Sequence, residues 1–269
     1  MLITRDMKPE DEYFVSTCSH VNESEEIDRC ASKRRSLFAE LKERGALFKV
    51  ALLEGKHVGF AYGIPIEHSP WGPLGEDLVV IPCLYVLAPA TGQGAGRMLI
   101  ESIEDDARTM GRKGVTVTAY QGLYGADWFM PASYFEHIGY ETVAIHQSAI
   151  LLWKPFTPDA ESPRFLRPDY AFKERPGKVV VDLFWNAFCE TSNIEAERVR
   201  DVCSEFGDRV ILNEYQAEDR ATLLAHQIPR AIFVNGKEIF WGYEAPKEGI
   251  RAAIKKALLG CDTGGRDEG

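Results

Sequence analysis

The segment from Val79 to Arg112 constrains the fold more than any other part of the chain. It opens with an apolar run, Val79 to Leu87, which has the length of one buried strand, and passes through Thr91-Gly92-Gln93-Gly94-Ala95-Gly96 into a helical pattern. Apolar residues recur there at helical spacing: Leu99, Ile103, Ala107 and Met110. The order strand, glycine loop, helix presents unpaired backbone N–H groups and the positive end of a helix dipole to an anion. The sequence therefore predicts an anion site at residues 91–97.

Three kinds of glycine loop fit this outline to different degrees. A Walker loop requires Gly-Lys-Ser/Thr before the helix, and the sequence lacks it. A dinucleotide-binding loop requires G-x-G-x-x-G and an acidic residue about twenty positions later. The chain has G-x-G-x-G, and its next expected strand, Val115 to Ala119, ends at Tyr120. A glycine-rich turn without a ligand stays open as the third interpretation.

The glycine loop resembles the acyl-CoA motif of a known family. Leu84-Tyr85-Val86, followed by residues 92–99 (GQGAGRML), is similar to the GNAT acetyltransferases, whose loop holds the coenzyme pyrophosphate. Downstream, residues 134–141 (YFEHIGYE) resemble the helix-to-strand segment of the same family. The resemblance covers about the first 155 residues, the size of one domain. It implies acetyl-CoA as co-substrate, bound by the following residues: Tyr85, Val86, Leu87, Thr91, Gly92, Gln93, Gly94, Ala95, Gly96 and Arg97.

Two positions depart from the family pattern. Thr91 stands where the family usually has Gln or Arg, and Gln93 and Arg97 are the residues available to compensate. Phe135 stands where the family frequently has a tyrosine that serves as general acid, and phenylalanine cannot protonate a leaving thiolate. Tyr134 is adjacent, but a neighbour on a helix points about 100° away. Tyr134 is therefore expected to pack, with replacement of the acid as the weaker interpretation.

A second catalytic candidate follows an expected hairpin. Leu47 to Leu53 and His57 to Ile66 predict its two strands around a Glu-Gly-Lys turn. Glu67 and His68 come directly after it and could deprotonate an ammonium acceptor, as acylation of an amine requires. Polar residues at the end of a hairpin are more often simply solvated, so both interpretations stay open.

Composition narrows the choice of partners. A formal net charge of -10 and a sequence pI near 5.2 argue against nucleic acid or an anionic membrane. No apolar run approaches the roughly twenty residues that span a bilayer, and the first residues, MLITRDMKPEDE, lack a signal-peptide core. The six cysteines form no C-x-x-C pair, and Cys18 with His20 is the nearest approach to a metal pair. We therefore expect a cytoplasmic chain with reduced thiols and no metal site.

A proline-rich stretch divides the chain. Residues 156–177 show no sustained period and predict a semi-stiff linker, or a wrapping segment that docks on one of the domains, between a domain at 1–155 and a second domain at 178–262, with a flexible tail at 263–269. The second domain opens with a buried strand, Val179 to Phe184, and continues with a helix, a strand, a short helix, a hairpin and a final helix. That alternation is typical of α/β proteins.

The second domain resembles the thioredoxin fold. Trp185 stands four residues before Cys189, and the Ile228-Pro229 turn with the hairpin after it is similar to the family's cis-proline segment. Because Ser192 replaces the resolving cysteine, Cys189 can form a mixed disulfide with a low-molecular-weight thiol but no disulfide within the motif. Its place at the first turn of a helix predicts a lowered pKa. A degenerate fold kept for structure or binding is the alternative.

The combination resembles the YoaP-type acetyltransferases of microbes and predicts an α/β (α+β) protein. The first hypothesis is an N-acetyltransferase that transfers an acetyl group from acetyl-CoA to an amine of a small molecule or peptide. Its rate would come mainly from positioning and from a backbone N–H that polarises the thioester carbonyl. The alternatives are a CoA-binding sensor whose transfer site has decayed and an adaptor regulated through Cys189. Acceptor, acyl chain length and oligomeric state are not indicated by the sequence.

Overall fold

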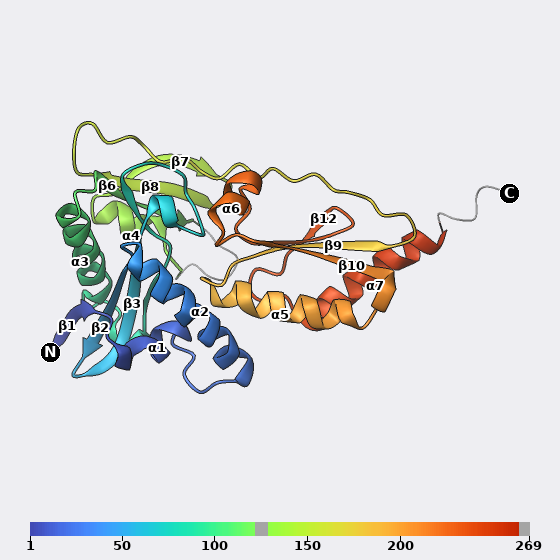
Figure 1. The fold of residues 1–269 in the computed structure, drawn as a ribbon. Helices are drawn as coiled ribbons and strands as arrows, with labels where there is room; N and C mark the ends of the chain where they lie inside the picture. Colours follow the sequence, from blue (N-terminus) through green and yellow to red (C-terminus); the bar gives the residue numbers. More distant parts are fainter. Residues whose placement is uncertain (122–128, 264–269) are drawn as a thin grey trace. The chain divides into compact units, whose positions relative to one another are not determined.

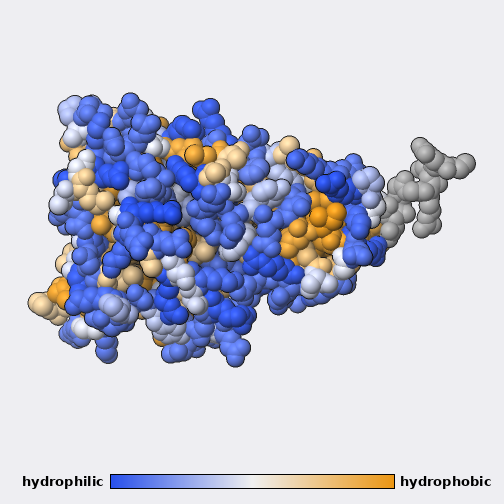
Figure 2. Space-filling view, viewed as in Figure 1, coloured by the Kyte–Doolittle hydropathy of each residue, from blue (hydrophilic) through white to orange (hydrophobic). Residues whose placement is uncertain are grey.

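The computed structural model describes residues 1–121 and 129–263, the last three of them by backbone alone. The chain forms two compact units, Met1–Leu166 and Arg167–Gly269, and each is described by itself (Figure 1). The tail expected at 263–269 lies, beyond its first residue, outside the described part of the chain. Among the described residues no helix is long and apolar enough to cross a membrane. The face drawn in Figure 2 is mostly hydrophilic, as the content of charged residues predicts.

The first unit is built on one mixed sheet with helices on both faces. The described strands follow the order β1-β2-β3-β4-β6-β8-β7, and β5 pairs with β3 outside that path. The elements of this unit are β1 (Leu2–Asp6), α1 (Glu12–Ser16), α2 (Glu25–Glu43), β2 (Leu47–Leu53), β3 (Lys56–Pro65), β4 (Leu78–Ile81), β5 (Leu84–Val86), α3 (Ala95–Thr109), β6 (Gly114–Tyr120), α4 (Ala132–His137), β7 (Glu141–His146) and β8 (Ala149–Pro155). The predicted hairpin corresponds to β2 and β3, and the helix predicted after the glycine loop corresponds to α3.

The apolar run at 79–87 forms two strands, where the sequence predicts one. β4 pairs in parallel with β6, with Ile81 opposite Val117, whereas β5 pairs with β3. Pro82 lies between β4 and β5 and has no N–H to give to a sheet ladder. The sheet therefore separates between β5 and β6, directly before the glycine loop.

Each face of the sheet has its own buried layer. On one face the apolar side of α3 packs against β1, β2, β3 and β6, and Leu99, Ile103 and Phe135 are fully buried in this layer. On the other face α2 places Phe38 5.5 Å from Tyr62 of β3, ring centroid to ring centroid. Residues of β3 alternate between these two layers, as the period of a strand requires. The face with α3 is the one that bears on the glycine loop.

The second unit contains a four-stranded sheet in the described residues, with order β10-β9-β11-β12. β9 and β10 are parallel, and β11 is antiparallel to both β9 and β12. In Figure 1, α5 and α7 lie on one face of this sheet and α6 on the other. The elements are β9 (Val179–Trp185), α5 (Glu190–Ser204), β10 (Val210–Gln216), α6 (Arg220–His226), β11 (Ala231–Val234), β12 (Lys237–Ile239) and α7 (Lys247–Thr263).

The stretch at 156–177 packs in part on the first unit and in part on the second. Leu74 and Arg164 exchange two backbone hydrogen bonds of 2.9 and 2.8 Å, which hold the beginning of the stretch to the first unit. Further along, the Tyr170 hydroxyl donates to the buried Asp182 carboxylate at 2.7 Å, and the Tyr170 ring stacks on Phe233 with centroids 3.9 Å apart. The boundary between the units accordingly falls inside the stretch, after Leu166.

Candidate functional site

The glycine loop, residues 91–97, is open at the N-terminal end of α3. Gly92 and Gly94 have φ angles of 75° and 86°, the left-handed region that favours glycine, and Gly94 is the residue that precedes the helix. A Cβ atom built on either glycine meets no atom of the other described residues within 4 Å. No described side chain therefore fills the space beside these two glycines.

Four consecutive backbone N–H groups at this end have no acceptor among the described residues. The N–H of Met98 donates to the carbonyl of Gly94 at 3.0 Å and starts the helical ladder. Before it, none of the N–H groups from Gly94 to Arg97 bonds to another residue that the structure describes. Free first-turn donors and the dipole of a 15-residue helix favour an anion at this position. The open helix end that the sequence predicts is therefore part of the fold.

The polar side chains of the loop stabilise the loop itself. The Gln93 amide donates to the carbonyl of Pro89 at 2.6 Å, and the Thr91 hydroxyl donates to the carbonyl of Leu87 at 3.4 Å. Arg97 is exposed and donates to Glu101, one helical turn later, at 2.7 Å. Compensation for Thr91 by Gln93 or Arg97 therefore requires that one of these two side chains changes its partner.

β5 turns one backbone edge toward the gap in the sheet. The N–H of Tyr62 donates to the carbonyl of Cys83, and the N–H of Leu87 donates to the carbonyl of Val58. Because alternate residues of a strand face alternate sides, Leu84 and Val86 point their N–H groups away from β3. Val86 also contacts the glycine loop, since its Cγ2 lies 3.6 Å from the position that a Cβ on Gly96 would take. The Tyr85 ring packs on the opposite face of the sheet, and the register turns its backbone polar groups toward β3, so the structure does not bring this residue's polar groups to the site.

Tyr134 and Phe135 point in different directions, as their helical spacing predicts. Phe135 is fully buried in the core beside Tyr140, with ring centroids 5.6 Å apart. The Tyr134 hydroxyl lies 2.9 Å from the position that a Cβ on Gly96 would take. This hydroxyl is buried without a hydrogen-bond partner among the described residues, and burial raises the pKa of Tyr134 to about 12. The structure thus brings Tyr134 to the glycine loop, where the sequence indicated packing.

Glu67 lies at the opposite end of α3 from the glycine loop. Its carboxylate accepts two bonds from Arg112, of 3.1 and 2.9 Å, and one from the N–H of Asp77 at 3.0 Å. Burial raises the pKa of Glu67, but the N–H donors and the Arg112 guanidinium offset this and leave the pKa below its ordinary value. Arg112 follows the C-terminal end of α3, and a helix of this length spans roughly 22 Å. The structure does not bring Glu67 to the loop, and a carboxylate with a lowered pKa is a weak base.

Cys189 immediately precedes α5 in the second unit and is half-buried. Its N–H donates to the side-chain oxygen of Asn186 at 3.0 Å, and the N–H of Asn186 donates to the Ser192 hydroxyl at 3.0 Å. Ser192 therefore has a structural partner in place of a redox one. Cys203 is buried and its pKa is raised to about 12 by burial, so it is no substitute for a resolving thiol.

The cis bond that the thioredoxin resemblance implied before Pro229 is absent. The peptide bond between Ile228 and Pro229 is trans. Among the described residues, a cis peptide bond occurs between Gly72 and Pro73. The carbonyl of Pro229 accepts a bond of 2.8 Å from the Asn186 amide, which ties this turn to the loop before Cys189. That part of the resemblance was wrong.

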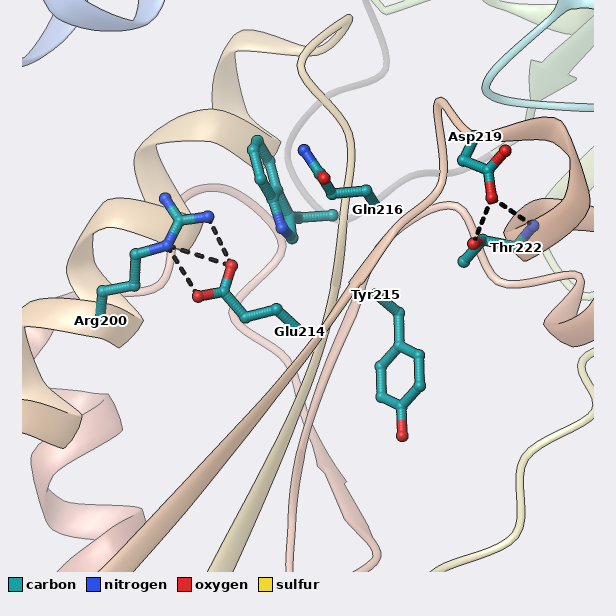
Figure 3. Close-up of a pocket in the computed structure, with 7 residues that line it drawn as sticks. Arg200, Glu214, Tyr215, Gln216, Asp219 and Thr222 are labelled. Atoms are coloured by element: carbon teal, nitrogen blue, oxygen red, sulfur yellow. Dashed lines mark hydrogen bonds and ion pairs between the residues drawn. The ribbon is translucent and has the colours of Figure 1, made fainter.

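A pocket of about 500 Å³ opens beside the carboxyl ends of β9 and β10 (Figure 3). The charged side chains that line it have partners within the pocket. Arg200 donates to Glu214 at 2.5 to 3.1 Å, and Asp219 accepts a hydrogen bond from the Thr222 hydroxyl at 2.7 Å. Cys189 is not among the residues that line it, which are Trp185, Arg200, Glu214, Tyr215, Gln216, Asp219 and Thr222. Within the described residues no cluster of three or more His, Cys, Asp or Glu side chains has an arrangement that could hold a metal ion.

Comparison with known proteins finds a family match within the first unit. The acetyltransferase (GNAT) family matches residues 11–124. No curated protein is significantly similar in sequence. Solved structures that resemble part of the chain include a putative GNAT acetyltransferase from Desulfovibrio desulfuricans (17% identity, 58% of this chain, 99% of that chain, TM-score 0.43). Two others are the PaiA N-acetyltransferase from Thermoplasma acidophilum in complex with coenzyme A (14%, 58%, 99%, 0.41) and YncA, a putative acetyltransferase from Salmonella typhimurium, with acetyl-CoA (14%, 60%, 97%, 0.44). The first unit therefore contains a GNAT acetyltransferase domain at residues 11–124.

Proposed function

We propose that the first unit is an N-acetyltransferase that transfers an acetyl group from acetyl-CoA to an amine of a small molecule or peptide. The GNAT match at 11–124 supports the reaction class, and the PaiA and YncA structures, which hold CoA and acetyl-CoA, support the co-substrate. The observation that carries the proposal in this chain is the open end of α3. Its N–H groups from Gly94 to Arg97, which bond to no other residue that the structure describes, fit a doubly charged diphosphate.

The residues of the loop fit such a group in shape as well as in charge. Gly92 and Gly94 leave space where a side chain would stand, so a diphosphate can approach the main chain closely. Arg97 adds a positive charge at the first turn, although Glu101 holds it in the free chain. The end of α3 thus offers the positive partial charge of a helix N-terminus on a chain whose net charge is -10.

The chemistry that we propose needs few protein groups. The nitrogen of a neutral amine attacks the thioester carbon, the carbon–sulfur bond breaks with its electron pair on sulfur, and the nitrogen loses a proton to solvent. The N–H of Val86, which the register of β5 turns away from β3, is the donor that we assign to the thioester carbonyl. A thiolate whose conjugate acid has an ordinary pKa of about 8.5 leaves readily near neutral pH, so Phe135 does not preclude the reaction.

Binding tests this proposal first. Titration calorimetry of the intact chain with acetyl-CoA should give a measurable dissociation constant, and Gly94→Glu should abolish binding, because a carboxylate would stand at the end of α3. Gly111→Glu is the matched control, since Gly111 has a φ of 72° with equally open surroundings but follows the other end of α3. Absence of binding by the intact chain, or equal binding by the two variants, would refute the assignment of the loop.

Turnover separates the enzyme from the alternative of a decayed sensor. Release of free CoA is followed with a thiol reagent while the intact chain and acetyl-CoA are mixed with a panel of amines and amino-terminal peptides. Release that depends on an amine supports the transferase. Tight binding of acetyl-CoA without release on any amine supports the sensor.

We propose that the second unit is a thioredoxin-like domain with one reactive thiol, Cys189. The strand order β10-β9-β11-β12, with β9 and β10 parallel, supports this fold, and the place of Cys189 before α5 supports its role. With residues 1–155 as the acetyltransferase, 156–177 as the connection and 178–262 as this domain, the organisation is the one expected of a YoaP-like chain. Treatment with glutathione disulfide followed by intact-mass measurement should show one adduct fewer for Cys189→Ser than for the wild type. Equal labelling would discard the role.

A further inference from the structure

We propose that the Tyr134 hydroxyl is a further binding group of the glycine loop, which donates a hydrogen bond to the diphosphate of coenzyme A. The inference rests on the proposed function, because it takes the diphosphate as the ligand of the loop. It gives Tyr134 a different role from the general acid considered for this residue in the sequence.

The hydroxyl lies over the backbone of the first helical turn. A Cβ on Gly96 would stand 2.9 Å from the hydroxyl oxygen and 3.5 Å from the ring carbon that bears it. In an α-helix each Cα–Cβ bond tilts toward the N-terminus, so the Cβ position that the hydroxyl approaches is displaced from the Gly96 Cα toward the end of the helix where the N–H groups have no described partner. A phosphate oxygen that approaches those N–H groups therefore approaches the hydroxyl too. Glycine at position 96 is what leaves the room for this arrangement.

The free chain leaves this hydroxyl without a partner among the residues that the structure describes. It is shielded from water and makes no hydrogen bond to any of them. Buried polar atoms in this condition are uncommon in folded proteins because they lose their bonds to water and gain nothing in return. An anionic acceptor bound at the loop supplies the missing bond, and a bond to a charged acceptor is stronger than a bond to a neutral one.

The pKa of the Tyr134 hydroxyl favours a role as hydrogen-bond donor over a role in proton transfer. Burial raises the pKa of Tyr134 to about 12, and the nearby Arg97 opposes the shift only in part. A thiol has an ordinary pKa of about 8.5, so transfer of the proton from this tyrosine to a thiolate would be unfavourable at equilibrium. The hydroxyl keeps its proton and can hold a phosphate oxygen throughout turnover.

Tyr134→Phe in the full chain tests the inference, since it removes the hydroxyl alone. We expect calorimetry to show CoA bound about tenfold more weakly than by the wild type. Adenosine 3′,5′-bisphosphate, which lacks the diphosphate, should bind both proteins equally. The melting temperature of the variant should equal or exceed that of the wild type, because no hydrogen bond within the described chain is lost.

Tyr140→Phe is the matched control. Tyr140 is a second buried tyrosine beside Phe135, but its hydroxyl is close to Glu104 and not to the loop, so CoA affinity should not change. Unchanged CoA affinity in Tyr134→Phe would overturn the inference, as would an equal loss for adenosine 3′,5′-bisphosphate. A lowered kcat with a shifted pH profile and intact CoA affinity would assign Tyr134 to acid catalysis and overturn it as well. Failure of the wild type to bind CoA would refute the proposed function instead.

Discussion

Gly96 and Tyr134 should be energetically coupled, because the missing side chain of one makes room for the hydroxyl of the other. In Gly96→Ala the new methyl would stand 2.9 Å from the Tyr134 hydroxyl oxygen, closer than ordinary contact between carbon and oxygen. The tyrosine must then rotate from its preferred torsions, at a cost of about 0.5–1.5 kcal/mol. Alanine in a helix is favoured over glycine by about 1 kcal/mol, which offsets that cost.

The same substitution should behave differently once the hydroxyl is removed. In a Tyr134→Phe background the nearest atom to the new methyl is the ring carbon, at 3.5 Å, an ordinary van der Waals contact. Without the contact with the hydroxyl, the helix preference of alanine over glycine is not offset, and Gly96→Ala should stabilise the unit by about 1 kcal/mol. The expected coupling between the two positions is therefore about 0.5–1.5 kcal/mol.

Scanning calorimetry of the full chain measures this coupling through the transition of the first unit in the wild type, both single variants and the double variant. Gly96→Ala alone should move the melting temperature little, whereas the same change made on top of Tyr134→Phe should raise it by a few degrees. Circular dichroism of each protein confirms that the fold is retained. Equal shifts in the two backgrounds would refute the contact between Gly96 and Tyr134.

Three further outcomes follow from single contacts. Glu101→Gln frees Arg97 from its ion pair, so calorimetry should show CoA bound several-fold more tightly, and unchanged affinity would mean that Arg97 takes no part. Tyr170→Phe leaves the buried Asp182 carboxylate without this donor and should lower the stability of the second unit by about 1–3 kcal/mol in thermal unfolding, whereas an unchanged transition would contradict the role of the bond. Burial raises the pKa of Asp11, but hydrogen bonds from Arg5, the N–H of Lys8 and His57 together leave this pKa below its ordinary value. The charged Asp11 therefore stabilises the fold fully above its unfolded pKa of about 3.9, and this stabilisation is lost as the pH falls through the lower folded pKa. Asp11→Asn should therefore flatten the loss of melting temperature below pH 4, and an unchanged pH profile would contradict this.

Local patterns in the sequence were sufficient for the central element. Two glycines at a helix start, with apolar residues at helical spacing behind them, determine the positive φ angles, the free N–H groups and the buried side of α3, because these depend on neighbours within one or two turns. The start of α2 is equally local, since the Ser24 hydroxyl accepts the N–H of Ile27 at 3.2 Å and serine is a preferred residue at this position.

The partners of each strand and the location of Glu67 relative to α3 depended on the tertiary structure. The apolar run at 79–87 matches one strand by length, yet its two halves have different partners, because strand pairing is set by β3 and β6 far away in the chain. Glu67 follows the hairpin directly in the sequence, but Arg112 holds it at the far end of α3. Proximity in the sequence carries no information about which end of a distant helix a loop will meet.

The sequence by itself determined that residues 91–97 would offer backbone donors to an anion, since torsion angles and helix ends are short-range properties. Only the tertiary structure decided which of two neighbouring aromatic residues reaches that site. Tyr134 and Phe135 are adjacent on α4, and the packing of α4 on the sheet buries the Phe135 ring and leaves the Tyr134 hydroxyl beside Gly96. Neighbours on a helix point about 100° apart, and only the position of α3 beside α4 decides which of the two side chains lies at the glycine loop.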